Sequence, residues 1–257
     1  MLKRIAGLVV VVLLIFSAPV ALPQQEQAQT VYTFVSLWQI PRANWAQFSE
    51  NSEKITNPIL QKMLSDGAII SWGTFETVVH TPDGMTHGGW FQATSLAGIT
   101  RVLDELLKGA SRPALNTATK HEDYLLRTLA RHASPQPGAS GYVRVRTTLA
   151  QPGKGGDLVA HIQKYIWPVL EDQFKKGNLT YYAADEQYIL TGPGSLRNFV
   201  TFYPSAEALD KVVTAVSARL ASMSADERQA WQEGLSKLTV PESTRDMLAR
   251  VTHYAQK

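Results

Sequence analysis

Hydrophobic and polar positions follow two periods along this chain, and the periods succeed one another in the same order in both halves. In the first half, alternating apolar and polar positions predict strands over residues 31–39, 69–80, 88–95 and 121–129. Apolar stripes at helical spacing predict helices over 42–67 and 96–109. The second half has the same order, with strands at 141–149, 179–190, 197–205 and about 251–255, and helices at 156–177 and 206–220. Each half is therefore predicted to be a β-α-β-β-α-β unit.

A repeat with a spacing of 110 residues supports this division. The segment NPILQKMLSDGAI at 57–69 is matched by WPVLEDQFKKGNL at 167–179, with the proline and the glycine kept in both copies. The proline predicts a kink or a new helical segment, and the glycine predicts the end of the helix. Solenoid units are much shorter than this spacing, so the chain is predicted to contain a duplicated domain.

The second half is longer than the first by a stretch at about 222–243, which precedes its last strand. The stretch is rich in helix-forming residues, and we expect a helical insertion there. A surface decoration is favoured over a lid or a partner site.

The predicted order of elements is that of the split β-α-β arrangement, an antiparallel sheet with both helices on one face. The other face needs a cover, and a duplicated unit can supply one by packing sheet against sheet within one chain. In this the chain resembles the dimeric α/β-barrel superfamily, in the form with two fused ferredoxin-like repeats. The predicted fold class is α+β, with two tandem repeats forming an intramolecular α/β barrel.

Residues 1–22 have a basic start followed by an apolar run and small residues, which is typical of a signal peptide. A polar spacer over 23–30 and a Pro/Gly/Ser-containing linker over 131–140 then delimit two repeats, at 31–130 and 141–257. We expect a secreted or periplasmic protein. An uncleaved N-terminal anchor is the alternative, because the apolar run is barely long enough to span a bilayer.

Composition narrows the possible chemistry. The chain is 44% hydrophobic and 18% charged, as globular proteins are, and it has no cysteine, which excludes disulfides and thiolate catalysis. The formal net charge of +3 is mild and is not gathered in basic runs, so no nucleic-acid partner is expected. No membrane partner is expected once the leader is removed.

Strand alternation suggests which side chains line the space between the two sheets. We assign the aliphatic face of the first strand of each repeat to the helices and the aromatic and polar face to the cavity. The predicted ligand-binding residues are Tyr32, Trp38, Trp72, Trp90, Arg144, Arg146 and Tyr188. The two arginines suit an anionic ligand, since a guanidinium can hold a carboxylate through two hydrogen bonds. The favoured alternative is that they pair with acids such as Glu76 and Glu186, or lie on a solvated edge.

Glu76, His80 and Glu186 are the candidate catalytic residues, because a carboxylate or imidazole in a dry cavity can act as a general base. A structural ion pair remains the favoured interpretation of both glutamates. His80, His87 and His121 could together hold a metal, but hairpin histidines are usually solvated, and no metal is expected.

The resemblance adds one further candidate. Some members of the superfamily bind haem through a helix histidine, which makes His161 the place to look; a partly buried structural histidine is favoured there. No cofactor is expected, and haem is the alternative.

Two functional hypotheses follow. The first is an exported protein that binds a small anionic or aromatic molecule in an inter-sheet cavity. The second, implied by the resemblance, is a small oxygenase-like or isomerase-like enzyme, cofactor-free or haem-dependent, with Trp38, Trp72, Trp90, Glu76 and His80 as the site. Neither the ligand nor the oligomeric state follows from the sequence.

Overall fold

The computed structural model describes residues 30–108, 115–134, 141–190 and 195–257. The predicted leader and nearly all of the spacer lie outside these residues, as does most of the predicted linker. Within the described part of the chain, no helix has both the length and the apolar character needed to cross a bilayer.

The first repeat has the predicted order of elements. Its strands are β1 (Tyr32–Gln39), β2 (Ser71–Thr77), β3 (His87–Ala93) and β4 (Lys120–Ala133). Its helices are α1 (Trp45–Asn51), α2 (Asn57–Ser65) and α3 (Leu96–Lys108). Shorter helical turns are η1 (Arg42–Asn44), the π-helical η2 (Ser52–Thr56) and η3 (Leu115–Thr117). Residues 131–133, predicted to begin the linker, extend β4 instead.

The second repeat keeps this order and adds one helix. Its strands are β5 (Tyr142–Leu149), β6 (Tyr181–Gln187), β7 (Leu196–Tyr203) and β8 (Arg245–Gln256). Its helices are α4 (Gly155–Tyr165), α5 (Trp167–Lys175), α6 (Ala206–Ala221) and α7 (Ala225–Leu238). Helix α7 is the predicted insertion.

The repeated motif forms a corner in both copies. Gly67 and Gly177 have φ angles of 77° and 73°, a left-handed conformation that ends the helix without the strain a side chain would cause. In the second copy the helix breaks at Ile166, one residue before α5, as the predicted kink requires. In the first copy the π-helical turn η2 precedes the proline, and Asn57 does not cap the helix.

All eight strands form one closed antiparallel barrel, in the order β1-β3-β2-β8-β5-β7-β6-β4. Within each repeat the order is that of a ferredoxin-like sheet, which confirms the predicted fold. The edge strands of the two sheets also pair with each other, β2 with β8 and β4 with β6. Closure leaves neither sheet with an unpaired edge.

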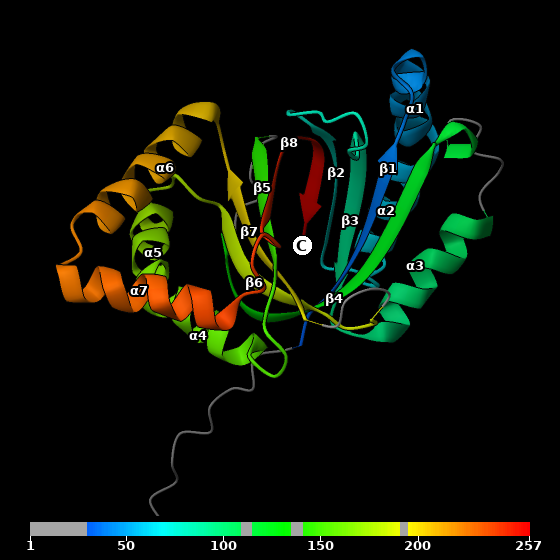
Figure 1. Ribbon diagram of the computed structural model, residues 1–257. Coiled ribbons are helices and arrows are strands. Elements are labelled where there is room, and N and C mark those ends of the chain that lie inside the picture. The colour runs from blue at the N-terminus through cyan, green and yellow to red at the C-terminus, as the bar shows by residue number, and fades with distance from the viewer. Residues whose placement is uncertain (1–29, 109–114, 135–140, 191–194) are drawn as a thin grey trace, which may run out of the picture.

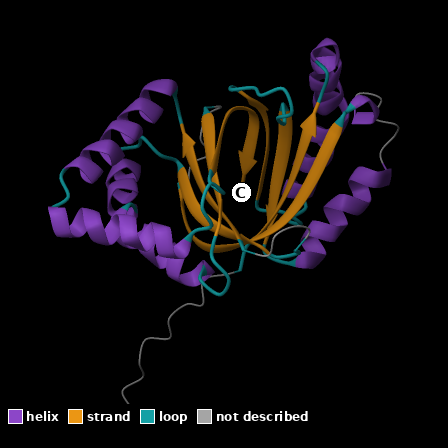
Figure 2. Ribbon diagram, in the orientation of Figure 1, coloured by secondary structure: helices purple, strands orange, loops and turns teal. Residues whose placement is uncertain are grey.

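The molecule is layered outward from this barrel. Figure 1 shows α1, α2 and α3 on one flank and α4, α5, α6 and α7 on the other, and Figure 2 shows the strands between these two helical layers. Each helical layer packs on its own sheet through a separate core, one around Trp72 and Phe91 and one around Tyr182 and Tyr203. A third apolar cluster, containing Phe75 and Trp90, lies inside the barrel. The strands beneath the helices are therefore covered on both faces, whereas the outer face of β4 is largely exposed.

Candidate functional site

At most positions, the strand face that lines the barrel interior is the one predicted to face the helices. Thr33, Val35 and Leu37 of β1 line the interior of the barrel, although the aliphatic face was assigned to the helices. The interior face of β5 is likewise the aliphatic one, with Val143 and Val145. The physical reason is that both faces of β1 are covered, one by the helical layer and one by the barrel interior, so alternation alone does not say which face is turned inward.

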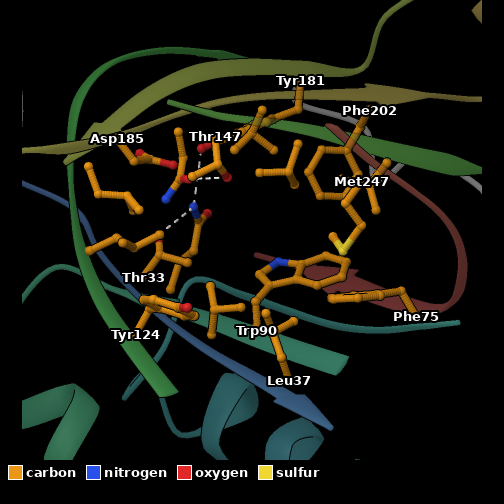
Figure 3. Close-up of a pocket in the computed structure, with 18 residues that line it drawn as sticks. Thr33, Leu37, Phe75, Trp90, Tyr124, Thr147, Tyr181, Asp185, Phe202 and Met247 are labelled. Carbon is orange, nitrogen blue, oxygen red and sulfur yellow. Dashed lines mark hydrogen bonds between the residues drawn. The ribbon is translucent and has the colours of Figure 1, made fainter. Parts of the chain in front are cut away.

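A cavity of about 200 Å³ lies inside the barrel (Figure 3). Of the residues predicted to bind ligand, Trp90 is in its wall, next to Phe75 and Phe202. Arg144 and Arg146 are not, because they project from the other face of β5.

Those arginines line a second, larger space, a cleft of about 420 Å³ between the second sheet and its helices. In the described part of the first repeat, the equivalent place is filled by side chains. There Phe34 and Phe91 are opposite each other on neighbouring strands, and their rings stack with centroids 5.2 Å apart. The positions 110 residues later hold Arg144 and Thr201, which are also opposite each other. Replacing an aromatic pair by a guanidinium and a hydroxyl leaves the cleft open where the first repeat is filled.

The walls of the cleft differ in chemistry. The sheet side contributes polar groups, and the helices contribute a nearly continuous apolar surface. The helical part of the wall consists of Leu158, Ile162, Ile166, Trp167, Leu170, Val212, Val213, Val216, Ser217, Leu220, Trp231 and Leu235. The cleft therefore has an apolar helical wall and a sheet wall that carries its polar groups.

The polar side is organised around one carboxylate. Nε of Arg144 donates to Oδ1 of Asp246 over 3.1 Å, and Nη2 of Arg146 donates to Oδ2 over 2.8 Å. Burial would raise the pKa of Asp246, but the hydrogen bonds and charges of the two arginines outweigh it and hold that pKa below its ordinary value. Two guanidinium groups share one carboxylate, so this cluster keeps a net positive charge that an anion can complement.

A buried phenol completes the polar side. The hydroxyl of Tyr203 lies 2.7 Å from Oγ1 of Thr201, and burial raises the pKa of Tyr203 above its ordinary value. Tyr203 is therefore neutral and available to share a hydrogen bond in the cleft.

Helix α7 closes one end of this cleft and so is more than the surface decoration that the sequence favoured. Its Trp231 lines the cleft and stacks on His161 of α4, with ring centroids 5.0 Å apart. Nε2 of His161 lies 3.1 Å from the carbonyl oxygen of Trp231. At Gly234 the two helices come so close that a Cβ atom would clash with the His161 ring.

We expect Gly234→Ala to lower the free energy of unfolding by about 1 to 3 kcal/mol, because the added methyl group must displace the His161 ring or the whole helix. Urea denaturation measures this. Gly156→Ala in α4 is the matched control, since a Cβ there meets no atom within 4 Å. That control should be neutral or stabilising by up to about 1 kcal/mol. Equal effects of the two substitutions would mean that α7 does not sit tightly on α4.

Several solved structures share the fold of this chain at low sequence identity. No family model matches the chain, and no curated protein matches it in sequence. A candidate monooxygenase from Lactobacillus acidophilus NCFM has a TM-score of 0.59 at 11% identity, covering 89% of this chain and 96% of that one. An anthrone oxidase-like protein has 0.56 at 10% identity, covering 90% and 94%. The chain has the fold of the dimeric α/β-barrel proteins. A haem-binding protein from Thermus thermophilus also shares it, with a TM-score of 0.52 at 10% identity, covering 87% and 93%.

On this α/β barrel the two predicted catalytic glutamates lie apart and face outward. Glu186 is 17% exposed and pairs with Arg127 and with Nη2 of Arg197, the latter over 3.1 Å. This is a structural ion pair, as the sequence favoured, although the partners are not Arg144 and Arg146. Glu76 is half-buried on β2, which does not neighbour β6 in the barrel. The two acids therefore do not form a site together.

The three histidines considered for a metal are separated by aromatic rings. The ring of Trp45 contacts both His80 and His87, each at a centroid distance of 5.2 Å. His121 instead stacks on Trp38 and lies 2.9 Å from Oγ of Ser36. In the described residues, no group of three or more His, Cys, Asp or Glu side chains could hold a metal ion.

His87 is nevertheless unusual for a histidine. Only 4% of it is exposed, and burial, with a smaller contribution from the charge of His80, lowers its pKa to about 4. Its Nδ1 lies 2.9 Å from Oγ1 of Thr86. This neutral imidazole, which belongs to β3, contributes to the packing of α1 against the strand.

The described residues do not fit a haem held through His161. This imidazole is not part of the cleft wall, and it is engaged by both the ring and the carbonyl oxygen of Trp231. Binding an iron would require His161 to give up both contacts. No chemical step is therefore assigned to haem.

The remaining predicted ligand-binding residues lie outside both cavities. Trp72 is buried in the core beneath α2 and α3, and Trp38 packs on Phe48. Tyr32 and Tyr188 contact each other edge to face at 5.2 Å on the outer side of the barrel. With Glu76 and His80 also elsewhere, the set proposed for cofactor-free chemistry does not assemble.

Sequence reasoning missed Asp185, Tyr203 and Trp231. A residue-by-residue comparison of the two repeats could have found some of them. The difference between Phe34 and Arg144 marks the cleft, and that between Phe75 and Asp185 marks the barrel interior. Trp231 has no counterpart in the first repeat, because it belongs to the insertion.

Proposed function

We propose that this protein, after export, binds a small amphipathic anion in the cleft between the second sheet and its helices. The observation that carries the proposal is the exchange of the stacked Phe34–Phe91 pair for Arg144 and Thr201 at the same place in the second repeat. Filling that space with apolar side chains would be more stable, as the first repeat illustrates. A cleft kept open and edged with arginine is instead suited to a ligand.

The chemistry of the walls defines the class of ligand. A carboxylate, sulfonate or phosphate would bind at Arg144 and Arg146, whose side chains are 34% and 50% exposed. An aromatic or branched aliphatic body would pack against the apolar helical wall that ends at Trp231. The volume of about 420 Å³ falls within the range of sites for drug-sized molecules.

Asp246 has a defined part in this proposal. In the absence of ligand it holds both arginines in place, so that they need little reordering when an anion arrives. It accepts from Nε of Arg144, whose guanidinium group also interacts with the hydroxyl of Tyr203 in the cleft wall. The similar folds that are described as a monooxygenase and as a haem-binding protein support a small-molecule site on this barrel, by analogy of fold alone.

The test uses anilinonaphthalene sulfonate, a fluorescent aromatic anion too large for the cavity inside the barrel. We expect the probe to bind the wild type and to bind the double variant Arg144→Ala with Arg146→Ala at least about tenfold more weakly, since charge-assisted hydrogen bonds contribute about 1.5 to 3 kcal/mol each. Fluorescence titration measures both affinities.

The chain offers a closely matched control. Asp66 also accepts from two cations, Nζ of Lys62 over 2.7 Å and Nη2 of Arg101 over 3.1 Å, on the surface of the first repeat. Lys62→Ala with Arg101→Ala removes the same charge and should leave the affinity for the probe unchanged. Unchanged affinity in the Arg144 and Arg146 double variant would contradict the proposal.

A further inference from the structure

The cavity inside the barrel has two chemically different ends. Figure 3 shows Phe75, Phe202 and Met247 at one end and Thr33, Thr147 and Asp185 at the other, with Trp90 between. The cavity takes no part in the proposed function, because it lies on the opposite face of the sheet from the cleft.

Most polar groups at the polar end satisfy one another. Nε2 of Gln92 donates to Oγ1 of Thr33 over 3.1 Å and lies 3.2 Å from the hydroxyl of Tyr181. Oγ1 of Thr147 donates to Oδ1 of Asn198 over 2.8 Å. These pairs form a fixed polar rim that needs no ligand to complete it.

Asp185 is the exception. Its side chain lines the cavity and only 3% of the residue is exposed, yet Oδ1 has no hydrogen-bond partner among the residues that the structure describes. A buried acceptor without a partner costs about 1 to 3 kcal/mol, and more if it is charged. The equivalent position in the first repeat is Phe75, so an apolar side chain is compatible with this place in the fold.

The groups around Asp185 do not remove this cost. Burial raises its pKa to about 7, and the hydroxyl of Thr128 and the charge of Arg131, both on β4, offset only part of that effect. Thr128 lies opposite Asp185 on the neighbouring strand, but its Oγ1 makes no hydrogen bond of normal geometry to any described residue. The residue opposite it on β7 is Asn198, already bonded to Thr147. An acceptor of this kind is poised for a donor that enters the cavity.

We propose that the barrel interior is a second binding site, separate from the cleft, for a neutral ring-sized molecule with one hydroxyl or N–H donor, such as a phenol or an indole. The ring would lie between Trp90, Phe75 and Phe202, and the donor would bond to Oδ1 of Asp185. The size agrees, because a cavity of about 150 Å³ holds benzene and this one is about 200 Å³. Anions are disfavoured by the carboxylate.

The test compares two probes of nearly equal shape, para-fluorophenol and para-fluorotoluene, by fluorine NMR titration near neutral pH. Only the first has a donor. We expect the wild type to bind para-fluorophenol about tenfold more tightly than para-fluorotoluene, which corresponds to one good hydrogen bond. In Asp185→Leu we expect that preference to be lost or reversed. Any change in cavity volume affects both probes alike, so their ratio isolates the hydrogen bond.

Asp104→Leu is the control for loss of a carboxylate, because Asp104 is exposed on α3; it should keep the wild-type ratio. The proposal is overturned if neither probe binds the wild type, or if Asp185→Leu keeps the wild-type ratio. A wild type that prefers para-fluorotoluene overturns it as well. Failure of the anion site in the cleft would not affect any of these results.

Discussion

Replacing Asp185 by asparagine is expected to make the protein progressively more stable than the wild type as the pH rises from about 4 to 8. The group has a folded pKa of about 7 against an ordinary value of 3.8, so the folded state holds its proton more tightly than the unfolded chain does. The resulting stabilisation is fully present below the unfolded pKa and is lost as the pH rises through the folded one. At 1.36 kcal/mol per pKa unit, the full change is about 4 kcal/mol.

Urea denaturation of both proteins at several pH values in this range measures the effect. Thr128 and Asn198, which lie opposite Asp185, have no titratable group, and burial raises the pKa of Tyr181 above its ordinary value, so none of the three changes charge in this pH range. The amide introduced by Asp185→Asn has no proton to exchange, so the difference between the two curves reports Asp185 alone. If the two curves of stability against pH were parallel, the Asp185 carboxyl would be solvated and would have its ordinary pKa in the folded protein. Asp104→Asn, at an exposed site on α3, is the control for loss of a carboxylate in itself.

The second large effect is expected from closing the cleft. In the double variant Arg144→Phe with Thr201→Phe, the second repeat acquires the aromatic pair that Phe34 and Phe91 form in the first. Burying two more rings should stabilise the fold by roughly 2 kcal/mol or more. Asp246 keeps Arg146 as a partner, so no buried charge is left alone. Binding of anilinonaphthalene sulfonate should be abolished.

Thermal unfolding and the fluorescence titration together test this prediction, since most substitutions that abolish binding by damaging the fold also lower Tm. A higher Tm with no binding is the expected pair of results. Retained binding would place the probe elsewhere, and a lower Tm would show that the two repeats do not share this geometry. Phe34→Leu with Phe91→Leu, in the first repeat, should lower Tm and leave the affinity unchanged.

The order and kind of the elements could be predicted because they depend on local periodicity and on duplication. Alternation, helical stripes and the motif shared by 57–69 and 167–179 are visible without any tertiary contact. The glycines ended their helices as expected, and the extra segment formed helix α7. Closure of the barrel through β2–β8 and β4–β6 pairing followed from two sheets of one kind that each needed cover.

Which face of each strand lies inside the barrel could not be predicted in the same way. Period-two alternation identifies the two faces of a strand, but it names the inner one only when the other is polar and solvated. In this barrel the face of β1 with Phe34 and the face with Val35 are both covered. As a result the sequence predicts Trp72, Arg144 and Glu186 in an interior that they do not line.

The duplicated β-α-β-β-α-β architecture and the positions at which the copies diverge can be derived from the sequence alone, because both are properties of residues compared along one chain. The space that each divergent residue enters depends on the tertiary structure. Arg144 opens a cleft under the helices, whereas Asp185 enters the barrel, although each replaces a phenylalanine of the first repeat. The physical reason is that a site is a convergence of side chains from strands and helices far apart in sequence, and that convergence is set by the packing of all the layers together.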